Sequence, residues 1–271
     1  MSETASTAVC GDHLLVEQQG EWLTVWFNQP EKRNPLSTAM TDELLVVLHE
    51  VARDRGIRGV TLRGKGGYFC AGGDLAGFHR MFEADRDTVI AMSEQAAVLF
   101  AAIDQLPQVT IALVEGAAMA GGLGLVCCCD VALGTRGAKF GFSETQIGIT
   151  PAQIARYVVA KVGPAVARRL LVTAARFDGE CAAQWGLLDI MEDDVSELEA
   201  REAALRQDVL RCAPGAIAAT KALLRQLPET PAAEIPRLAG ENFAYAFMSA
   251  EGREGIASFI EKRRPHWYRE N

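Results

Sequence analysis

Short apolar segments alternate with segments of helical periodicity over the first 190 residues, and this alternation constrains the fold more than any other feature. The strand-type segments include Trp22–Phe27, Gly59–Arg63 and Thr110–Val114. The stretches 40–51 and 85–104 separate them and carry apolar residues at a spacing of three to four. Because that spacing is typical of helices and short apolar runs are typical of strands, the sequence predicts an α/β fold.

The rest of the chain consists of shorter elements followed by a long helical tail. We expect helices over 120–129, 152–162, 164–174 and 178–185, and short strands at Val131–Gly134, Lys139–Gly141 and Leu187–Met191. From about residue 195 onward no strand pattern remains, and prolines interrupt the helical one. This organisation predicts a flexible tail over 1–12, a core over 13–198 and a C-terminal helical region over 199–271.

Charge and cysteine content exclude several classes of function. Lys and Arg number 27 against 35 Asp and Glu, which gives a net charge of −8. An acidic chain without a basic stripe argues against nucleic-acid binding and against a polybasic membrane patch. The N-terminus lacks the pattern of a signal peptide and no apolar run is long enough to span a bilayer, so we expect a cytoplasmic protein. The seven cysteines include the run Cys127–Cys129 but no Cys-x-x-Cys pair, which predicts buried free thiols and no metal site.

Two glycine-rich turns follow apolar strands and are the first candidates for chemistry. They are Tyr68–Leu75 and Ala117–Gly124, and the second opens a helix. Glycine lets backbone N–H groups approach a ligand closely, and a helix N-terminus adds a partial positive charge. Neither turn fits the dinucleotide or P-loop pattern. Each turn alone is better explained as a tight connection without a ligand, so the spacing predicts no more than an anion or carbonyl site.

Six segments, in order along the chain, resemble the landmarks of the crotonase family, also called the enoyl-CoA hydratase/isomerase family. They are Asn28–Asn34, Phe69–Leu75, Val114–Gly122 with Cys129-Asp130, Phe140–Glu144 with Gly148–Pro151, Ala183–Asp189 and Phe259–Pro265. The resemblance implies a spiral core of ββα turns over 13–198 and a C-terminal helical trimerisation region over 199–271. It also implies a homotrimer or a dimer of trimers.

The resemblance further implies a site that stabilises the enolate of a CoA thioester. Two N–H groups at the thioester oxygen would form an oxyanion hole, and the matching donors are Gly73 and Gly121, with Glu144 as the acid/base. Coenzyme A belongs to the substrate, so no separate cofactor and no metal is expected. The positions matching the CoA contacts are Arg33, Ala71, Gly72, Asp74, Leu75 and Lys262, with Phe259 beside Lys262. Arg33 and Lys262 are alternatively solvated surface cations, and Asp74 a local turn cap.

One departure from the family pattern bears on the reaction. Hydratases of this family have two glutamates around the bound water, and Gly124 stands at the position of the first. A single Glu144 is compatible with hydration or with isomerisation of an enoyl-CoA, and a third hypothesis is a non-catalytic acyl-CoA-binding protein. Glu94 could be a second acid, but a solvated helix position is the simpler interpretation.

The run Ala120–Asp130, together with Gly148–Ile154 and Tyr157–Val159, resembles the branch that hydrates 3-methylglutaconyl-CoA and isohexenylglutaconyl-CoA. Such substrates carry a second carboxylate, for which Arg156 or Gln153 are candidate partners. We favour the simpler interpretation of Arg156 as an exposed helix residue. Hydration of a branched or glutaconyl-type enoyl-CoA is therefore our leading expectation.

Overall fold

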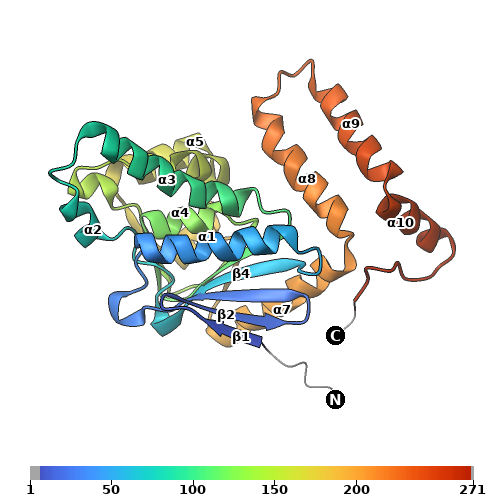
Figure 1. Ribbon diagram of the computed structural model, residues 1–271, viewed down its shortest axis with the longest axis horizontal. Helices are drawn as coiled ribbons and strands as arrows, with labels where there is room; N and C mark the ends of the chain where they lie inside the picture. The colour runs from blue at the N-terminus through green and yellow to red at the C-terminus, as the bar shows by residue number, and fades with distance from the viewer. Residues whose placement is uncertain (1–6, 270–271) are drawn as a thin grey trace.

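The structure is a computed structural model that describes residues 7–269, and its centre is a seven-stranded sheet (Figure 1). The strands lie in the order β1 (Thr7–Cys10), β2 (Leu14–Gln19), β3 (Trp22–Phe27), β4 (Gly59–Gly64), β5 (Val109–Val114), β7 (Val131–Thr135) and β10 (Ile190–Glu192). The pairings from β3 to β10 are parallel, and those of β1 and β2 are antiparallel. Crossovers through helices produce such parallel pairing, as the strand–helix alternation predicts.

A layer of helices covers one face of this sheet. It contains α1 (Thr38–Arg53), α2 (Leu75–Arg80), α3 (Arg86–Asp104), α4 (Gly121–Cys128) and α5 (Ala155–Thr173) (Figure 1). Apolar side chains at helical spacing in α1, among them Leu44 and Leu48, are buried in the main core with Val25 and Leu62 of the strands. The side-chain oxygen of Ser37 accepts a hydrogen bond from the N–H of Met40 and caps α1.

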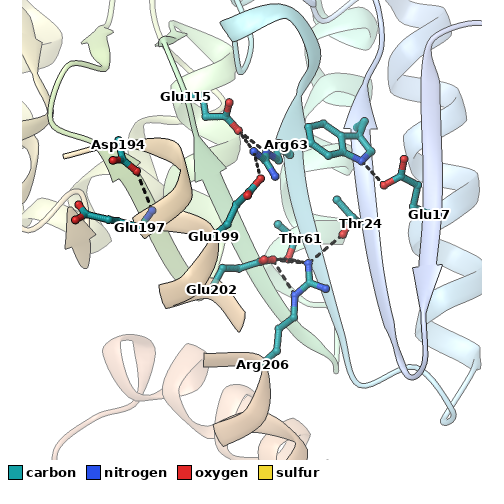
Figure 2. Close-up of polar contacts among 11 residues, drawn as sticks. Glu17, Thr24, Thr61, Arg63, Glu115, Asp194, Glu197, Glu199, Glu202 and Arg206 are labelled. Carbon is teal, nitrogen blue, oxygen red and sulfur yellow. Dashed lines mark hydrogen bonds and ion pairs between the residues drawn. The ribbon is translucent and has the colours of Figure 1, made fainter. Parts of the chain in front are cut away.

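Helix α7 (Val195–Arg211) packs on the opposite face of the sheet through apolar side chains, among them Leu198 and Val209, and through charged groups. In Figure 2, Glu202 receives hydrogen bonds from Thr61 and Arg206, and Arg206 also reaches the hydroxyl of Thr24 at 3.0 Å. Arg63 of β4 forms ion pairs with Glu115 and Glu199. The expected boundary at residue 199 therefore falls inside a helix that is packed on the core.

A second, three-stranded sheet supports the glycine-rich turns. It consists of β6 (Ala117–Met119), β8 (Lys139–Gly141) and β9 (Arg176–Asp178), and α6 (Gly179–Gln184) follows it. The sequence predicts β8 but not β6, β9 or α2, which are too short to show a period. The two helices expected over 152–162 and 164–174 form the single element α5, within which Gly163 has a φ of 76° before Pro164. The backbone thus breaks at the junction between the two expected helices, but the chain continues in helical form.

Three helices form an arm that extends from the body of the molecule (Figure 1). They are α8 (Pro214–Gln226), α9 (Ile235–Met248) and α10 (Ala250–Ile260). The buried guanidinium of Arg58 donates hydrogen bonds to the carbonyls of Val209 and Cys212 before the arm and of Trp267 after it. One side chain therefore ties both ends of the arm to the core.

Part of the N-terminal segment expected to be a flexible tail is a strand. The tail predicted to be flexible through residue 12 includes Thr7–Cys10, which form β1 and pair with β2 from Thr7↔Gln18 to Cys10↔Leu15. Hydrogen bonds to the antiparallel strand β2 order this segment. Its small and polar residues give no sign of that pairing in the sequence. Residues 1–6 lie outside the described part of the chain. Within that part, no helix is long and apolar enough to cross a bilayer.

Candidate active site

The structure brings the two glycine-rich turns into direct contact. Cys70 forms a parallel bridge with Ala118, and the N–H of Met119 donates to the carbonyl of Cys70 at 2.9 Å. A β-carbon placed on Gly72, where φ is +94°, would lie 2.9 Å from the Cβ of Ala120. On Gly122 it would lie 2.6 Å from the Cβ of Cys70. Glycine at these two positions therefore permits a spacing that any side chain would prevent.

In each turn, the N–H of the glycine predicted to be a donor has no protein acceptor in the described part of the chain. Within residues 7–269, no hydrogen bond is found from the N–H of Gly73 or from the N–H of Gly121. Gly121 is the first residue of α4, so its N–H is one of the groups that a helix leaves unpaired and adds to the positive end of the helix dipole. Ala120 precedes it in the strained conformation φ 48°, ψ −125°, and the hydrogen bond from its N–H to the carbonyl of Gly141 (2.8 Å) holds that turn.

Glu144 lies on the loop that this hydrogen bond fixes beside α4. Strand β8 runs parallel to β6 with Met119 opposite Gly141, and Glu144 begins the 3₁₀ turn η3 (Glu144–Ile147) three residues later. The residue is only 8% exposed, and its Oε2 is buried without a hydrogen-bond partner. Burial is the main cause that raises the pKa of this carboxyl above its ordinary value. The structure thus places a buried titratable group three residues after Gly141, whose carbonyl binds the N–H of Ala120 at the start of the second turn.

Apolar side chains surround the two donors. The ring of Phe78 lies 2.9 Å from the position of a β-carbon on Gly73, and Leu36 lies 3.1 Å from that of Gly121. A β-carbon on Gly124 would lie 2.9 Å from the Cβ of Ile154 and 3.2 Å from the ring of Phe100. The space of a side chain at position 124 is therefore already filled. Sequence reasoning did not identify Phe78 or Ile154, because their proximity to the glycines depends on contacts between distant segments.

The predicted CoA-contacting residues near the first turn lie together. Arg33 is exposed, and its guanidinium lies 5.3 Å from the ring of Tyr68. Its carbonyl accepts the N–H of exposed Ala71 at 2.9 Å. The carboxylate of Asp74 accepts the N–H of Ala76 and caps α2, as the turn-cap interpretation expects, and Leu75 after it is exposed.

Lys262 is a predicted site residue that does not lie near the first glycine-rich turn within the single chain. It follows α10, which lies at the opposite side of the molecule from α2 in Figure 1. Lys262 and Phe259 are both exposed there, Phe259 by 86%. The sequence pattern identifies their family position but not their place relative to Gly73.

The remaining candidates, Glu94, Arg156 and Gln153, lie on or beside helices and contact solvent or neighbouring side chains. Glu94 on α3 is exposed, and so is Arg156, which stacks on the ring of Tyr157 at 4.9 Å. The amide of Gln153 donates to the hydroxyl of Ser93 at 2.8 Å. Both solvated-helix interpretations therefore agree with the structure.

The cysteine run is buried within α4 and at its C-terminal end, as predicted. Burial raises the pKa of Cys127 and of Cys129 to about 12, so both are neutral thiols near pH 7. No cluster of His, Cys, Asp or Glu that could hold a metal occurs among residues 7–269.

Comparison with known proteins gives consistent matches over nearly the whole chain. The family model described as enoyl-CoA hydratase/isomerase matches residues 17–270. The 2,3-dehydroadipyl-CoA hydratase of Escherichia coli K12 is 30% identical over 93% of this chain and 97% of its own. Two solved structures superpose closely. Pseudomonas aeruginosa AtuE does so with a TM-score of 0.91 and 41% identity over 95% of this chain and 100% of its own.

The second structure is an enoyl-CoA hydratase/isomerase from Marinobacter aquaeolei. It superposes with a TM-score of 0.90 and 36% identity over 95% of this chain and 99% of its own. These structural matches confirm the expected crotonase-type α/β core with its C-terminal helices. The chain belongs to the enoyl-CoA hydratase/isomerase family and is an enzyme of that family.

Proposed function

We propose that this enzyme adds water to the double bond of an enoyl-CoA thioester, with Glu144 as the single acid/base. The observation that carries the proposal is a buried carboxyl oxygen without a partner, on the loop after β8, together with two N–H groups without acceptors in the touching turns that β6 connects to that strand. A free carboxylate can take a proton, and free donors can stabilise an oxygen that becomes negative. An apolar surrounding strengthens both effects because it lowers the local dielectric constant.

The proposed reaction proceeds through an enolate. The Glu144 carboxylate removes a proton from water while the water oxygen bonds to Cβ of the enoyl group, and the electron pair moves to the thioester oxygen. The N–H groups of Gly73 and Gly121 stabilise that oxyanion, each by about 2.7–4 kcal/mol. The protonated Glu144 then returns its proton to Cα, which regenerates the carboxylate. Its raised pKa favours both steps, because the group has to accept and donate a proton near neutral pH.

For the acyl group, we propose a branched or glutaconyl-type chain. The resemblance of the segment Ala120–Asp130 to the glutaconyl-hydrating branch supports this choice. The Escherichia coli relative, whose name specifies a dehydroadipyl thioester, also supports an acyl group with a second carboxylate. Loss of enoyl absorbance with crotonyl-, 3-methylglutaconyl- and isohexenylglutaconyl-CoA tests it, and we expect the highest kcat/KM with a glutaconyl-type substrate. The highest kcat/KM with crotonyl-CoA would contradict this choice.

Isomerisation of an enoyl-CoA is the second candidate. Ile154 fills the space beside Gly124, so the site has one carboxyl where two would hold a water between them. One carboxyl suffices to move a proton between two carbons of the same acyl chain. A third, non-catalytic role in binding acyl-CoA predicts no turnover of any thioester while CoA binding persists.

We also propose that the chain forms a homotrimer or a dimer of trimers through the arm. Large apolar side chains are exposed on α9 and α10, namely Phe243, Tyr245, Phe247, Met248, Ile256, Phe259 and Ile260. A cluster of this kind on one monomer is typical of a protein–protein interface. A neighbouring subunit would also provide the route by which Lys262 reaches a CoA molecule.

A further inference from the structure

A buried asparagine joins the loop of Arg33 to the segment before the Gly73 turn. Asn34 is 1% exposed and has the left-handed φ of 53°, a conformation that asparagine tolerates better than most residues. Its Oδ1 accepts the N–H of Gln29 at 2.8 Å. Its Nδ2 donates to the carbonyls of Lys65 and Tyr68 at 3.0 and 2.7 Å. Three hydrogen bonds from one side chain therefore connect residues that are more than 30 positions apart.

Backbone hydrogen bonds continue this connection as far as the first turn. The carbonyl of Arg33 accepts the N–H of Ala71 at 2.9 Å, and the N–H of Leu36 donates to the carbonyl of Gly72 at 2.8 Å. The two segments thus form one ladder with the Asn34 amide at its start. Because Arg33 and Ala71 belong to this ladder, their separation is set by groups that Asn34 holds in place.

We propose that Asn34 is a positioning residue for the nucleotide half of a CoA thioester, an inference that rests on the proposed function. Arg33 is an exposed cation beside Tyr68, which suits a phosphate, and the backbone at Ala71 is an exposed edge. The Gly121 N–H and Glu144 lie on other segments, outside the hydrogen bonds of Asn34, and Gly73 is held by the Leu36–Gly73 bridge at the far end of the ladder. Asn34 therefore acts on the affinity for the nucleotide and not on the reacting carbons.

The test replaces the amide and compares long with short substrates. Asn34→Asp keeps the shape and the acceptor but loses both donors and places a negative charge against two carbonyls. Loss of these bonds reduces the affinity for CoA about tenfold or more. We expect a similar rise in KM for enoyl-CoA with kcat within about twofold of the wild-type value. The pantetheine thioester of the same acyl group lacks the nucleotide, so its kcat/KM stays unchanged.

Two further variants make the test decisive. Asn34→Gly also tolerates the left-handed φ and removes the amide without adding charge, so it is expected to show the same selective loss if Asn34→Asp does not fold. Asn242→Asp is the matched control, because the Asn242 amide donates to the carbonyl of Ala219 in the arm, and it leaves CoA affinity unchanged. An equal loss with the pantetheine substrate, or an unchanged affinity for CoA, would overturn the inference.

Calorimetric titration with CoA alone separates this inference from the proposed function. Weaker CoA binding by Asn34→Asp in an enzyme that hydrates no enoyl-CoA would leave the inference standing and refute the proposed function. Hydration of enoyl-CoA by the wild type, with unchanged CoA affinity in Asn34→Asp, would support the proposed function and refute the inference about Asn34. Failure of the wild-type protein to bind CoA would contradict both.

Discussion

At the scale of single residues, the site is defined by Glu144 and by what surrounds it. Its carboxyl is buried, has one oxygen without a partner and has a raised pKa because of desolvation. Such a group costs stability when it is ionised, which the fold tolerates where the group serves a reaction. Gly124 adds a second constraint, because Ile154 occupies the space of any side chain there.

The raised pKa predicts how Glu144→Gln changes stability with pH. The folded state binds the Glu144 proton more tightly than the unfolded state, so this residue reduces the free energy of unfolding as pH rises from its ordinary pKa through its raised one. Glutamine has no charge, so the variant is more stable than the wild type at pH 8 and the difference shrinks at pH 4. Urea unfolding at both pH values measures it, with the exposed Glu94→Gln as control. A variant less stable than wild type at pH 8 would contradict the prediction.

The contact between Gly124 and Ile154 predicts a compensating pair. Gly124→Glu alone pushes a side chain into Ile154, and overpacking of this kind costs about 1–3 kcal/mol before the burial of the charge is added. Ile154→Ala creates space beside position 124. Gly124→Glu is therefore expected to cost less stability in the Ile154→Ala background than in the wild type. Thermal unfolding of the three variants completes a double-mutant cycle. Purely additive changes in stability would show that the two positions do not compete for space.

At the scale of elements, the site depends on two turns that touch. Cys70 and Ala118 form the bridge between them, and Gly72 and Gly122 are the positions of closest approach. Strand β6 and helix α4 hold one donor, and the segment between β4 and α2 holds the other. The proposed oxyanion hole takes one N–H from each turn, so it depends on the contact between them.

Gly122→Ala is expected to separate the turns. The added methyl group meets Cys70, including its carbonyl oxygen at 2.7 Å, and the backbone has to move. A displacement of the donors lowers kcat about 10- to 100-fold, with a loss of stability of about 1–3 kcal/mol. Gly137→Ala is the control, because a β-carbon there meets nothing within 4 Å. Wild-type kcat in folded Gly122→Ala would contradict the role of this contact.

The sequence predicts the long elements better than the short ones, for a physical reason. Helix α1 and strand β4 have enough residues to show their period, so both are predicted nearly to their ends. Strands β6 and β9 have three residues each, and only pairing with β8 makes them strands. The two glycine turns stand out in the sequence itself, but their roles as donors and the role of Glu144 follow from family resemblance. The filling of position 124 by Ile154 and the hydrogen bonds of Asn34 depend on distant segments meeting, which no local pattern contains.

At the scale of the whole molecule, an acidic protein is proposed to bind a polyanion. The net charge of −8 disfavours CoA at long range, so binding depends on local groups such as Arg33 and the backbone at Ala71. The arm is the second global feature, because it exposes apolar side chains far from the turns and Arg58 ties its two ends to the core.

The exposed arm predicts self-association. Phe243→Ser with Phe259→Ser removes two of the most exposed apolar side chains of α9 and α10. We expect light scattering to report a trimer or hexamer for the wild type and a smaller species for this variant. Val172→Ser, an exposed apolar position on α5, keeps the wild-type mass. A monomeric wild type would refute the proposed interface.

The most direct measurement of the central claim is incubation of the enzyme with its enoyl-CoA substrate in heavy-oxygen water, followed by mass spectrometry of the product. Hydration by Glu144 predicts one heavy oxygen in the hydroxyl group of a 3-hydroxyacyl-CoA. It also predicts that Glu144→Gln slows incorporation about 10²–10⁴-fold, the range for loss of a general acid/base. A product with a shifted double bond and no heavy oxygen, or full incorporation by Glu144→Gln, would contradict it.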